Sequence, residues 1–271
     1  MIGAVIGDVV GSRFEFNNTD SKEFVLFNDE CEFTDDTVMT LAVAESIMKC
    51  MESRGNYDDL DTVAVSWLHR VGRRYPFCGY GGRFYKWMMG DIWEPYDSFG
   101  NGSAMRISAV GDIAKSVEEA KFLSDKLTCI SHNHAEGMKG AEAAAVAKTL
   151  LKMGKTKEYV IDYVDQVYYR LDKTVDYYRE ENDGQHGKET CQVTMPQAFV
   201  CFKEGNSFED VIRNCISIGG DSDTVAAIAG GIAEACYKVP KNMKKMVRKY
   251  LSKELRDILD RWEKYVVEVN K

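Results

Sequence analysis

Residues 217–235 read SIGGDSDTVAAIAGGIAEA and decide how this chain is interpreted. From Val225 to Ala235 the stretch is almost entirely small or apolar, and Glu234 is its only charged residue. A helix without a polar face is normally buried in the core of a protein. Asp221 and Asp223 therefore lie where a buried helix begins, and an unpaired carboxylate is costly there.

Helix capping is the simplest interpretation of these two acids. Asp is a favoured N-cap residue, and negative charge suits a helix N-terminus. Capping needs only one acceptor, however, and four polar side chains stand together from Asp221 to Thr224. Thr224 also occupies the position at which a capping box would have a glutamate or glutamine. Taken alone, the segment leaves capping and a second role equally open.

A second apolar helix begins with the same kinds of polar residue. Residues 33–47, FTDDTVMTLAVAESI, place Thr34, Asp35, Asp36 and Thr37 before a mainly apolar run. Four aspartates that meet in one place repel one another strongly and cannot all stay ionised without cations between them. Hard oxygen ligands suit Mg²⁺, Mn²⁺ or Ca²⁺ rather than zinc. The two segments together favour a divalent metal site over two independent caps.

The composition narrows the class of protein. Hydrophobic residues make up 45% and charged residues 29% of the 271 positions, which is ordinary for a soluble globular protein. The net charge of −8 argues against a general nucleic-acid or anionic-membrane surface, but it allows a small cationic pocket. No signal peptide and no run of about 18 apolar residues is found. The eight scattered cysteines lack a C-x-x-C pair, so we expect free thiols in the cytoplasm.

Helical patterns cover nearly the whole chain, and no linker divides it. The helix at residues 2–11 carries Gly3, Gly7 and Gly11 on one face, which lets another helix approach closely. The best candidate strand is EFVLF, residues 23–27. We therefore predict one all-α domain over residues 1–271. The other predicted helices cover residues 35–52, 58–72, 101–114, 117–130, 135–153, 156–169, 190–204, 207–216, 223–237, 241–250 and 252–268.

Glycine-rich loops are predicted at 77–83, 98–103 and 182–188, and the second of them leads directly into a helix. Its sequence, SFGNGSAMRIS at 98–108, would expose backbone N–H groups that can hold a phosphate. An ordinary turn is the simpler explanation of this loop on its own. No P-loop and no dinucleotide-binding fingerprint is present.

Three further features are weak evidence for a functional site when each is considered alone. The loop PFCGYGGRF at 76–84 offers Tyr80 for stacking on a base or ribose, although packing is the commoner role of a lone tyrosine. Glu15 follows the glycine-faced helix, and a lone glutamate is usually a solvated surface residue. His132 and His134 lack the H-E-x-x-H spacing of a metal site.

Together these stretches resemble the ADP-ribosylglycohydrolase family, and they match it in order along almost the whole chain. The paired TDDT and DSDT signatures, at opposite ends of an all-α chain, are the most specific part of the match. The matching stretches are GAVIGDVVGSRFE (3–15), FTDDTVMTLAVAES (33–46), GYGGRF (79–84), GNGSAMR (100–106), SHNHAEG (131–137), CQVTMPQAFVCF (191–202) and residues 217–235.

The resemblance implies an orthogonal all-α bundle with two Mg²⁺ or Mn²⁺ ions at its centre. It implies that Glu15 is the acid or base beside the metals, and that Asp35 and Asp36 join it in catalysis as ligands. The implied metal ligands are Thr34, Asp35, Asp36, Asp221, Asp223 and Thr224. The implied substrate-binding residues are Gly79, Tyr80 and Gly81 near the ribose, Gly100, Asn101, Gly102 and Ser103 at the diphosphate, and His132.

The implied activity is hydrolysis of the bond between ADP-ribose and a modified acceptor, through an oxocarbenium-like state. The substrate would be an ADP-ribosylated protein or another ADP-ribosylated acceptor. We expect the protein to be a cytoplasmic monomer without a membrane contact. Arginine, serine, a nucleic-acid end and a free ADP-ribose derivative all stay open as acceptors. Residues 174–189 match no family motif and are predicted to shape the pocket rim. The alternatives are a non-catalytic member of the fold and a metal-dependent hydrolase of another phosphorylated substrate.

Overall fold

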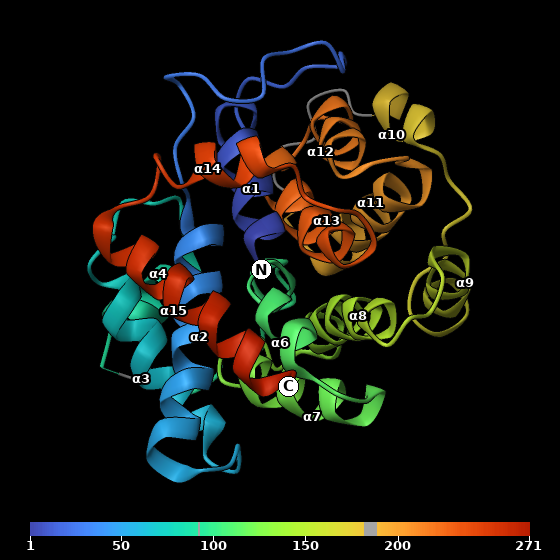
Figure 1. Cartoon of the computed structure of the whole chain (residues 1–271). Helices are drawn as coiled ribbons and strands as arrows, with labels where there is room; N and C mark the ends of the chain where they lie inside the picture. Colours follow the sequence, from blue (N-terminus) through green and yellow to red (C-terminus); the bar gives the residue numbers. More distant parts are fainter. Residues whose placement is uncertain (92, 182–188) are drawn as a thin grey trace.

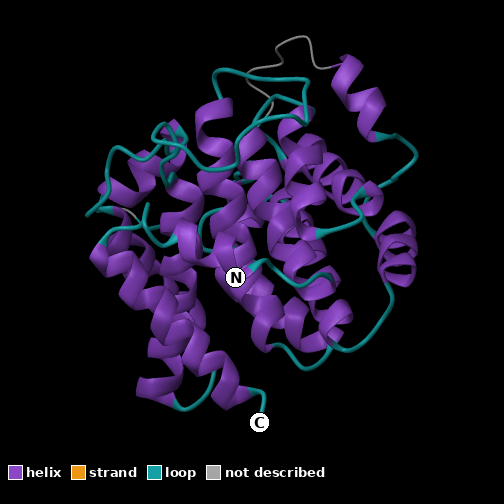
Figure 2. Ribbon diagram, turned by 45° about the horizontal axis from the view of Figure 1, so that its top comes forward, coloured by secondary structure: helices purple, strands orange, loops and turns teal. Residues whose placement is uncertain are grey.

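Helices form the regular secondary structure of this computed structural model, which describes residues 1–91, 93–181 and 189–271 (Figure 1). Within these ranges no strand is formed, so the predicted all-α class is confirmed (Figure 2). The elements are α1 (Ile2–Gly11), η1 (Ser12–Phe14), α2 (Asp35–Arg54), α3 (Leu60–Gly72), α4 (Gly82–Met89), α5 (Gly102–Met105), α6 (Ser108–Ile113), α7 (Val117–Thr128), α8 (Ala135–Lys152), α9 (Lys157–Val167), α10 (Val175–Glu181), α11 (Cys191–Glu204), α12 (Phe208–Ser217), α13 (Ser222–Cys236), α14 (Lys241–Val247) and α15 (Lys253–Val269).

Helix α13 lies at the centre of the bundle, as its apolar sequence predicts. It packs against α1, α8, α11 and α12, and its side chains from Ser222 to Ala233 are buried (Figure 1). Helix α2 packs against α1, α3 and α15 and buries most of its length as well. The polar segments at the starts of α2 and α13 are therefore both carried into the interior.

The glycine face of α1 packs on α13, which confirms the predicted close approach. A Cβ atom at Gly7 would lie 2.0 Å from the carbonyl oxygen of Ala226, and one at Gly11 would lie 2.3 Å from Cα of Asp223. No side chain larger than hydrogen fits at such distances. Because Gly11 touches the backbone of Asp223, the chain leaves α1 beside the start of α13. Glu15 follows within one short 3₁₀ turn.

The predicted boundaries hold for most helices, but the single helix expected at 101–114 is wrong. The chain forms α5 and α6 instead, and Arg106 and Ile107 separate them. Their ψ angles of −5° and −4° lie at the edge of the right-handed helical region, and a turn replaces the regular helix there. The side chain of Arg106 reaches out of this break to the backbone carbonyl of Leu127 and to Ser131.

The strand expected at residues 23–27 is also wrong. Phe24 packs its ring 5.0 Å from that of Phe14, and Phe27 stacks on Tyr250 at 5.8 Å. The apolar run therefore fixes an irregular segment through separate aromatic contacts, and no described residue offers it a partner strand. Alternation alone cannot distinguish these two situations.

Helices α4 and α10 were not predicted, and α10 lies within the stretch at 174–189 that matched no motif. The loop expected at 182–188 lies outside the described residues. Buried apolar side chains from Met1 to Trp262 form one connected core, which favours the prediction of a single domain. Among the described residues, none of the helices combines the length and the apolar character of a membrane span.

Candidate active site

The first acid of α13 is presented by a turn of two glycines. Gly219 and Gly220 have φ angles of 69° and 67°, a region that other residues rarely adopt. The side chain of Asn18 fixes this turn, since its amide donates to the carbonyl oxygen of Gly220 (3.0 Å) and its own oxygen accepts from the N–H of Gly220 (2.9 Å). The same amide also donates to the carbonyl oxygen of Glu15 (3.1 Å). Asn18 thus ties the segment of Glu15 to the turn before Asp221.

The first turn of α2 is held by a buried carboxylate of α1. Asp8 accepts hydrogen bonds from the Thr34 hydroxyl (2.6 Å) and from the backbone N–H groups of Thr34 and Thr37 (both 3.1 Å). The Thr34 hydroxyl accepts in turn from the N–H of Asp36 at 3.2 Å. Asp8 therefore orients the segment that carries Asp35 and Asp36.

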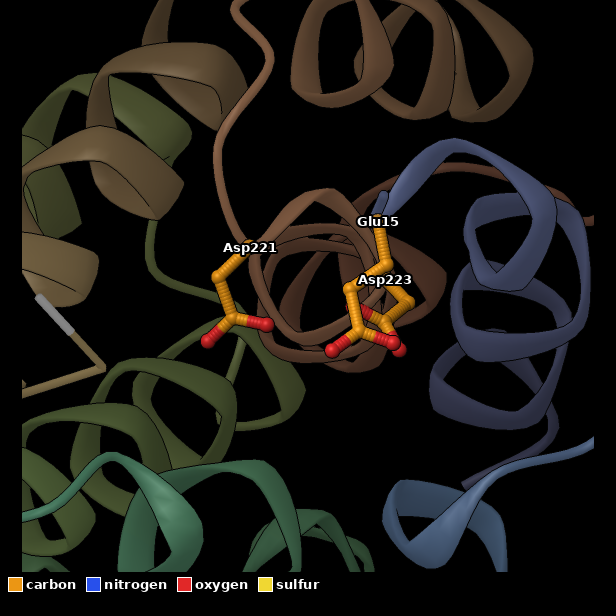
Figure 3. Close-up of side chains that lie close together, drawn as sticks. All are labelled: Glu15, Asp221 and Asp223. Carbon is orange, nitrogen blue, oxygen red and sulfur yellow. The ribbon is translucent and has the colours of Figure 1, made fainter. Parts of the chain in front are cut away.

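Acids from three elements converge between these two helix starts. Carboxylate oxygens of Glu15, Asp221 and Asp223 lie within 4.8 Å of one another, and Figure 3 shows the Glu15 carboxylate beside that of Asp223. The Thr224 hydroxyl donates to Asp36 at 3.0 Å and so joins α13 to α2. The structure thus brings together the two signatures that the sequence separates by almost 190 residues.

The electrostatics of this acid cluster are unfavourable for ionised carboxylates. Burial, together with the charge of Asp221, raises the pKa of Glu15 to about 7. Burial and the neighbouring acids raise the pKa values of Asp35, Asp36 and Asp223 well above the ordinary range. No lysine or arginine among the described residues forms an ion pair with these groups. The described part of the chain thus supplies negative charge here and no compensating cation.

Two oxygens of the cluster have no hydrogen-bond partner among the described residues. They are Oδ1 of Asp36 and Oδ1 of Asp223, both fully buried. An orphaned buried carboxylate oxygen is costly, and a hard divalent cation is the group that such oxygens bind best. The donor set therefore fits a Mg²⁺ or Mn²⁺ site on its own chemistry.

A cavity of about 420 Å³ opens beside the acid cluster. Of the predicted site residues, those that line it are Glu15, Asp35, Asp36, Gly79, Gly81, Gly100, Asn101, Gly102, His132, Asp221, Asp223 and Thr224. The lining also includes Phe84, Tyr96 and two basic residues, Arg83 and Arg106. The cavity thus combines several acids with two cationic side chains.

Three predicted residues do not line the cavity. Tyr80 stacks on Phe84, with ring centroids 5.8 Å apart, so its ring packs against the wall of the cavity. Ser103 is fully buried, and its hydroxyl donates to the carbonyl oxygen of Gly137 at 2.7 Å. Thr34 is held by Asp8, as described above. The ring of Tyr80 is thus packed, its hydroxyl has no hydrogen-bond partner among the described residues, and its contact with the ribose stays a prediction.

Asn101 lines the cavity beside Gly100 and Gly102, and its role at the diphosphate stays a prediction. Its amide donates to Asp221 (2.5 Å) and to the Thr194 hydroxyl (2.9 Å). It therefore orients an acid of the cluster. Because α5 has only four residues, the N–H groups of the Gly100–Gly102 loop do not form the start of a long helix.

Sequence reasoning missed Asp8, Asn18, Arg106 and Ser131 as parts of the site. Asp8 could have been noticed, since it is the one charge in an otherwise small and apolar helix. Asn18 and Ser131 carry no such signal, because their partners are distant in sequence. Arg106 stands inside the quoted GNGSAMR stretch, where only the glycine loop was considered.

Comparison with known proteins identifies the family of this chain. The family model described as ADP-ribosylglycohydrolase matches residues 1–269. ADP-ribosylhydrolase ARH3 of Mus musculus is 24% identical, with 88% of this chain and 82% of that protein covered. ADP-ribosylarginine hydrolase Tri1 of Pseudomonas putida is 26% identical, with 88% and 70% covered. A solved chain of an ADP-ribosylglycohydrolase-related protein complex shares the fold, with a TM-score of 0.67, 21% identity, and 92% of this chain and 96% of that one covered. This protein belongs to the ADP-ribosylglycohydrolase family.

Proposed function

We propose that this protein is a metal-dependent hydrolase that cleaves the glycosidic bond between ADP-ribose and a modified acceptor. The observation that carries this proposal is the uncompensated cluster of Glu15, Asp35, Asp36, Asp221 and Asp223, which lines the cavity. The relatives named as ADP-ribosylhydrolases support it. The acceptor stays open, because one relative is named for ADP-ribosylarginine and the other names no acceptor.

Two divalent ions, Mg²⁺ or Mn²⁺, are the proposed cofactors. The residues that would hold them are Thr34, Asp35, Asp36, Asp221, Asp223 and Thr224. When bound, such ions would orient hydroxyl groups of the ribose and lower the pKa of a bound water. Asn101 would keep Asp221 in position and Asp8 would keep Thr34 in position, since a ligand that is itself hydrogen-bonded holds its orientation.

Glu15 is the proposed acid or base. Its carboxyl group is half-buried, lines the cavity, and lies beside Asp221 and Asp223. In the metal-free protein, burial and the charge of Asp221 raise its pKa to about 7. A carboxyl group at this position can hold or accept a proton during the reaction. In the reaction the bond from the anomeric carbon to the acceptor breaks, and the oxygen of water bonds to that carbon. One proton passes from the water to the leaving acceptor, and Glu15 is placed to carry it.

Glu15→Gln tests this proposal, because it keeps the size of the side chain and removes the titratable proton. We expect a folded variant that keeps most of its Mn²⁺ and binds ADP-ribose. Release of ADP-ribose from a modified peptide should slow by roughly 10²- to 10⁴-fold, the usual contribution of general acid–base catalysis. Arginine-modified and serine-modified peptides, assayed in parallel with the parent enzyme, would identify the acceptor.

Two outcomes would contradict parts of the proposal. Turnover of Glu15→Gln within a few-fold of the parent would remove Glu15 from the chemistry. If ADP-ribose raises the melting temperature of the parent but neither peptide is cleaved with Mg²⁺ or Mn²⁺ present, the protein binds ADP-ribose without hydrolysing these bonds. Glu23→Gln, at an exposed position away from the cavity, is the matched control.

A further inference from the structure

A chain of two hydrogen bonds leads from a buried cation to His132. The guanidinium of Arg106 donates from Nη2 to Ser131 Oγ at 2.8 Å, and Ser131 Oγ lies 2.9 Å from Nδ1 of His132. Arg106 and Ser131 are fully buried, and His132 is 3% exposed. Arg106 and His132 line the cavity, and Ser131 connects them through the two hydrogen bonds.

The donors and acceptors in this chain can be assigned from its chemistry. Arginine only donates, so Ser131 Oγ is the acceptor of the first bond. The single hydroxyl proton of Ser131 then needs an acceptor of its own. Among the described residues, only Nδ1 of His132 is in hydrogen-bond reach of it. A buried hydroxyl that fails to donate would lose a hydrogen bond, so Ser131 donates to Nδ1.

His132 is consequently fixed in one protonation state. An Nδ1 that accepts a hydrogen bond carries no proton, so the proton of the neutral ring is on Nε2. Double protonation is disfavoured because burial, with the charges of Arg106 and Arg83, holds the pKa of His132 well below its ordinary value. The ring is therefore a neutral donor at Nε2.

Nε2 of His132 points toward the glycine loop. A Cβ atom placed on Gly102 would lie 3.2 Å from it, and one on Gly100 would lie 3.7 Å away. None of the described residues accepts a hydrogen bond from this atom. The N–H at this position is free to meet an oxygen that enters the cavity above the loop.

We propose that Arg106 and Ser131 are positioning residues that hold His132 as the Nε2–H tautomer, which donates to a phosphate oxygen of the substrate above Gly100–Gly102. Only the identity of that oxygen rests on the proposed function. The tautomer itself follows from the hydrogen bonds within the chain, so it can be tested without substrate.

The first test is side-chain ¹H–¹⁵N NMR on the metal-free protein. The chain has four histidines, and a His132→Gln variant identifies the signals of His132. We expect a ring that is protonated at Nε2, with the ¹⁵N shift of a hydrogen-bonded acceptor at Nδ1. A proton found on Nδ1 would overturn the proposal.

The second test uses Ser131→Ala, with Ser124→Ala as the matched control. Ser124 is also buried near the end of α7, but its hydroxyl has no partner among the described residues. Ser131→Ala should shift the Nδ1 signal and weaken ADP-ribose binding roughly three- to tenfold, the usual effect of one hydrogen bond. Mn²⁺ content and the control variant's affinity should stay unchanged. Equal affinity of Ser131→Ala and wild type would overturn the positioning role, whereas a wild type that binds no ADP-ribose would contradict the proposed function alone.

Discussion

Helix α13 carries buried acids at both of its ends, and the two ends differ in how their charge is balanced. Near its C-terminus, Glu234 pairs with Lys148 at 2.6 Å, and Lys148 also pairs with Asp112 at 2.7 Å. Asp112 accepts a further hydrogen bond from the indole of Trp262 at 3.0 Å. At the N-terminus of α13, Asp221 and Asp223 face other acids and no described cation.

The pKa values of the two clusters move in opposite directions. Burial on its own would raise the pKa of Asp112 and Glu234, but the charges of Lys148 and of the Met1 ammonium outweigh it and hold both pKa values below their ordinary range. Burial meets no such opposition at Asp223, whose pKa is raised well above the ordinary range. Buried acids that pair with cations of the same chain thus indicate a structural cluster. Buried acids without such cations indicate a site for an external cation.

The largest expected effect is that of Asp223→Asn, which should change activity and metal-free stability in opposite directions. A bound metal contributes several kcal/mol to catalysis, so loss of a ligand should lower kcat/KM by about 1000-fold or more. In chelator, the same substitution removes one charge from a repelling cluster and should raise the free energy of unfolding. Peptide hydrolysis and urea unfolding measure the two effects.

Asp176→Asn is the matched control for this comparison, because its side chain is 79% exposed on α10. Neither its activity nor its stability should change appreciably. A metal-free Asp223→Asn protein that is clearly less stable than wild type would instead identify Asp223 as a structural cap.

Lys148→Met, in the charge-balanced cluster near the C-terminus of α13, should lower the free energy of unfolding. It leaves Asp112 and Glu234 buried with the Met1 ammonium as their one remaining described cation. Breaking a buried pair in this manner costs about 3–5 kcal/mol of unfolding free energy. Lys121→Met breaks a pair with Glu142, and the Lys121 side chain is 41% exposed. This variant should lose less than about 1 kcal/mol of unfolding free energy. A loss of similar size in both variants would contradict the structural role of Lys148.

The stability lost in Lys148→Met should also depend on pH, and this smaller effect separates the two clusters further. Because the pKa values of Asp112 and Glu234 are lowered by folding, the unfolded chain binds more protons than the folded chain as the pH falls below about 5. Their stabilisation is complete above that pH and is lost on acidification. The difference between wild type and Lys148→Met should therefore be largest at pH 7 and shrink toward pH 3. A difference that grows on acidification would have the wrong sign.

How much of this could be predicted depends on whether the information is local in sequence. The starts of α2 and α13 were predictable, because each places two acids and a threonine directly before an apolar helix. The packing of α1 on α13 was predictable from three glycines at helical spacing. The division into α5 and α6 was not, since it follows the reach of Arg106 to Leu127 and Ser131.

The support of the site was the least predictable part for the same reason. Asp8 lies 26 residues before its partner Thr34, and Asn18 lies 202 residues before Gly220. Nothing in either neighbourhood indicates the distant contact. Residues that bind directly are thus visible as local motifs, whereas residues that position them become visible only through the fold.

Asp8→Asn tests such a positioning residue and is the smallest effect expected here. The variant amide can direct its oxygen to the N–H groups of Thr34 and Thr37, and its NH₂ group must then face the Thr34 hydroxyl. That hydroxyl now donates to Asp8 and accepts from Asp36, which leaves one lone pair for a metal. In the variant it would accept from both neighbours, and its proton would point toward the metal.

We therefore expect Asp8→Asn to weaken Mn²⁺ binding by roughly 10- to 100-fold, the usual effect of losing a group that orients a metal ligand. The metal-free protein should stay folded, because the amide oxygen of the variant can still accept from the N–H groups of Thr34 and Thr37. Calorimetric titration with Mn²⁺ measures the affinity. Asp165→Asn is the matched control. The Asp165 carboxylate also accepts a hydrogen bond from a backbone N–H group, that of Leu171, but it lies away from the cavity. This variant should leave the Mn²⁺ affinity unaltered. Wild-type affinity in Asp8→Asn would mean that α2 presents Asp35 and Asp36 without help from α1, and that the buried carboxylate of Asp8 only closes the helix start.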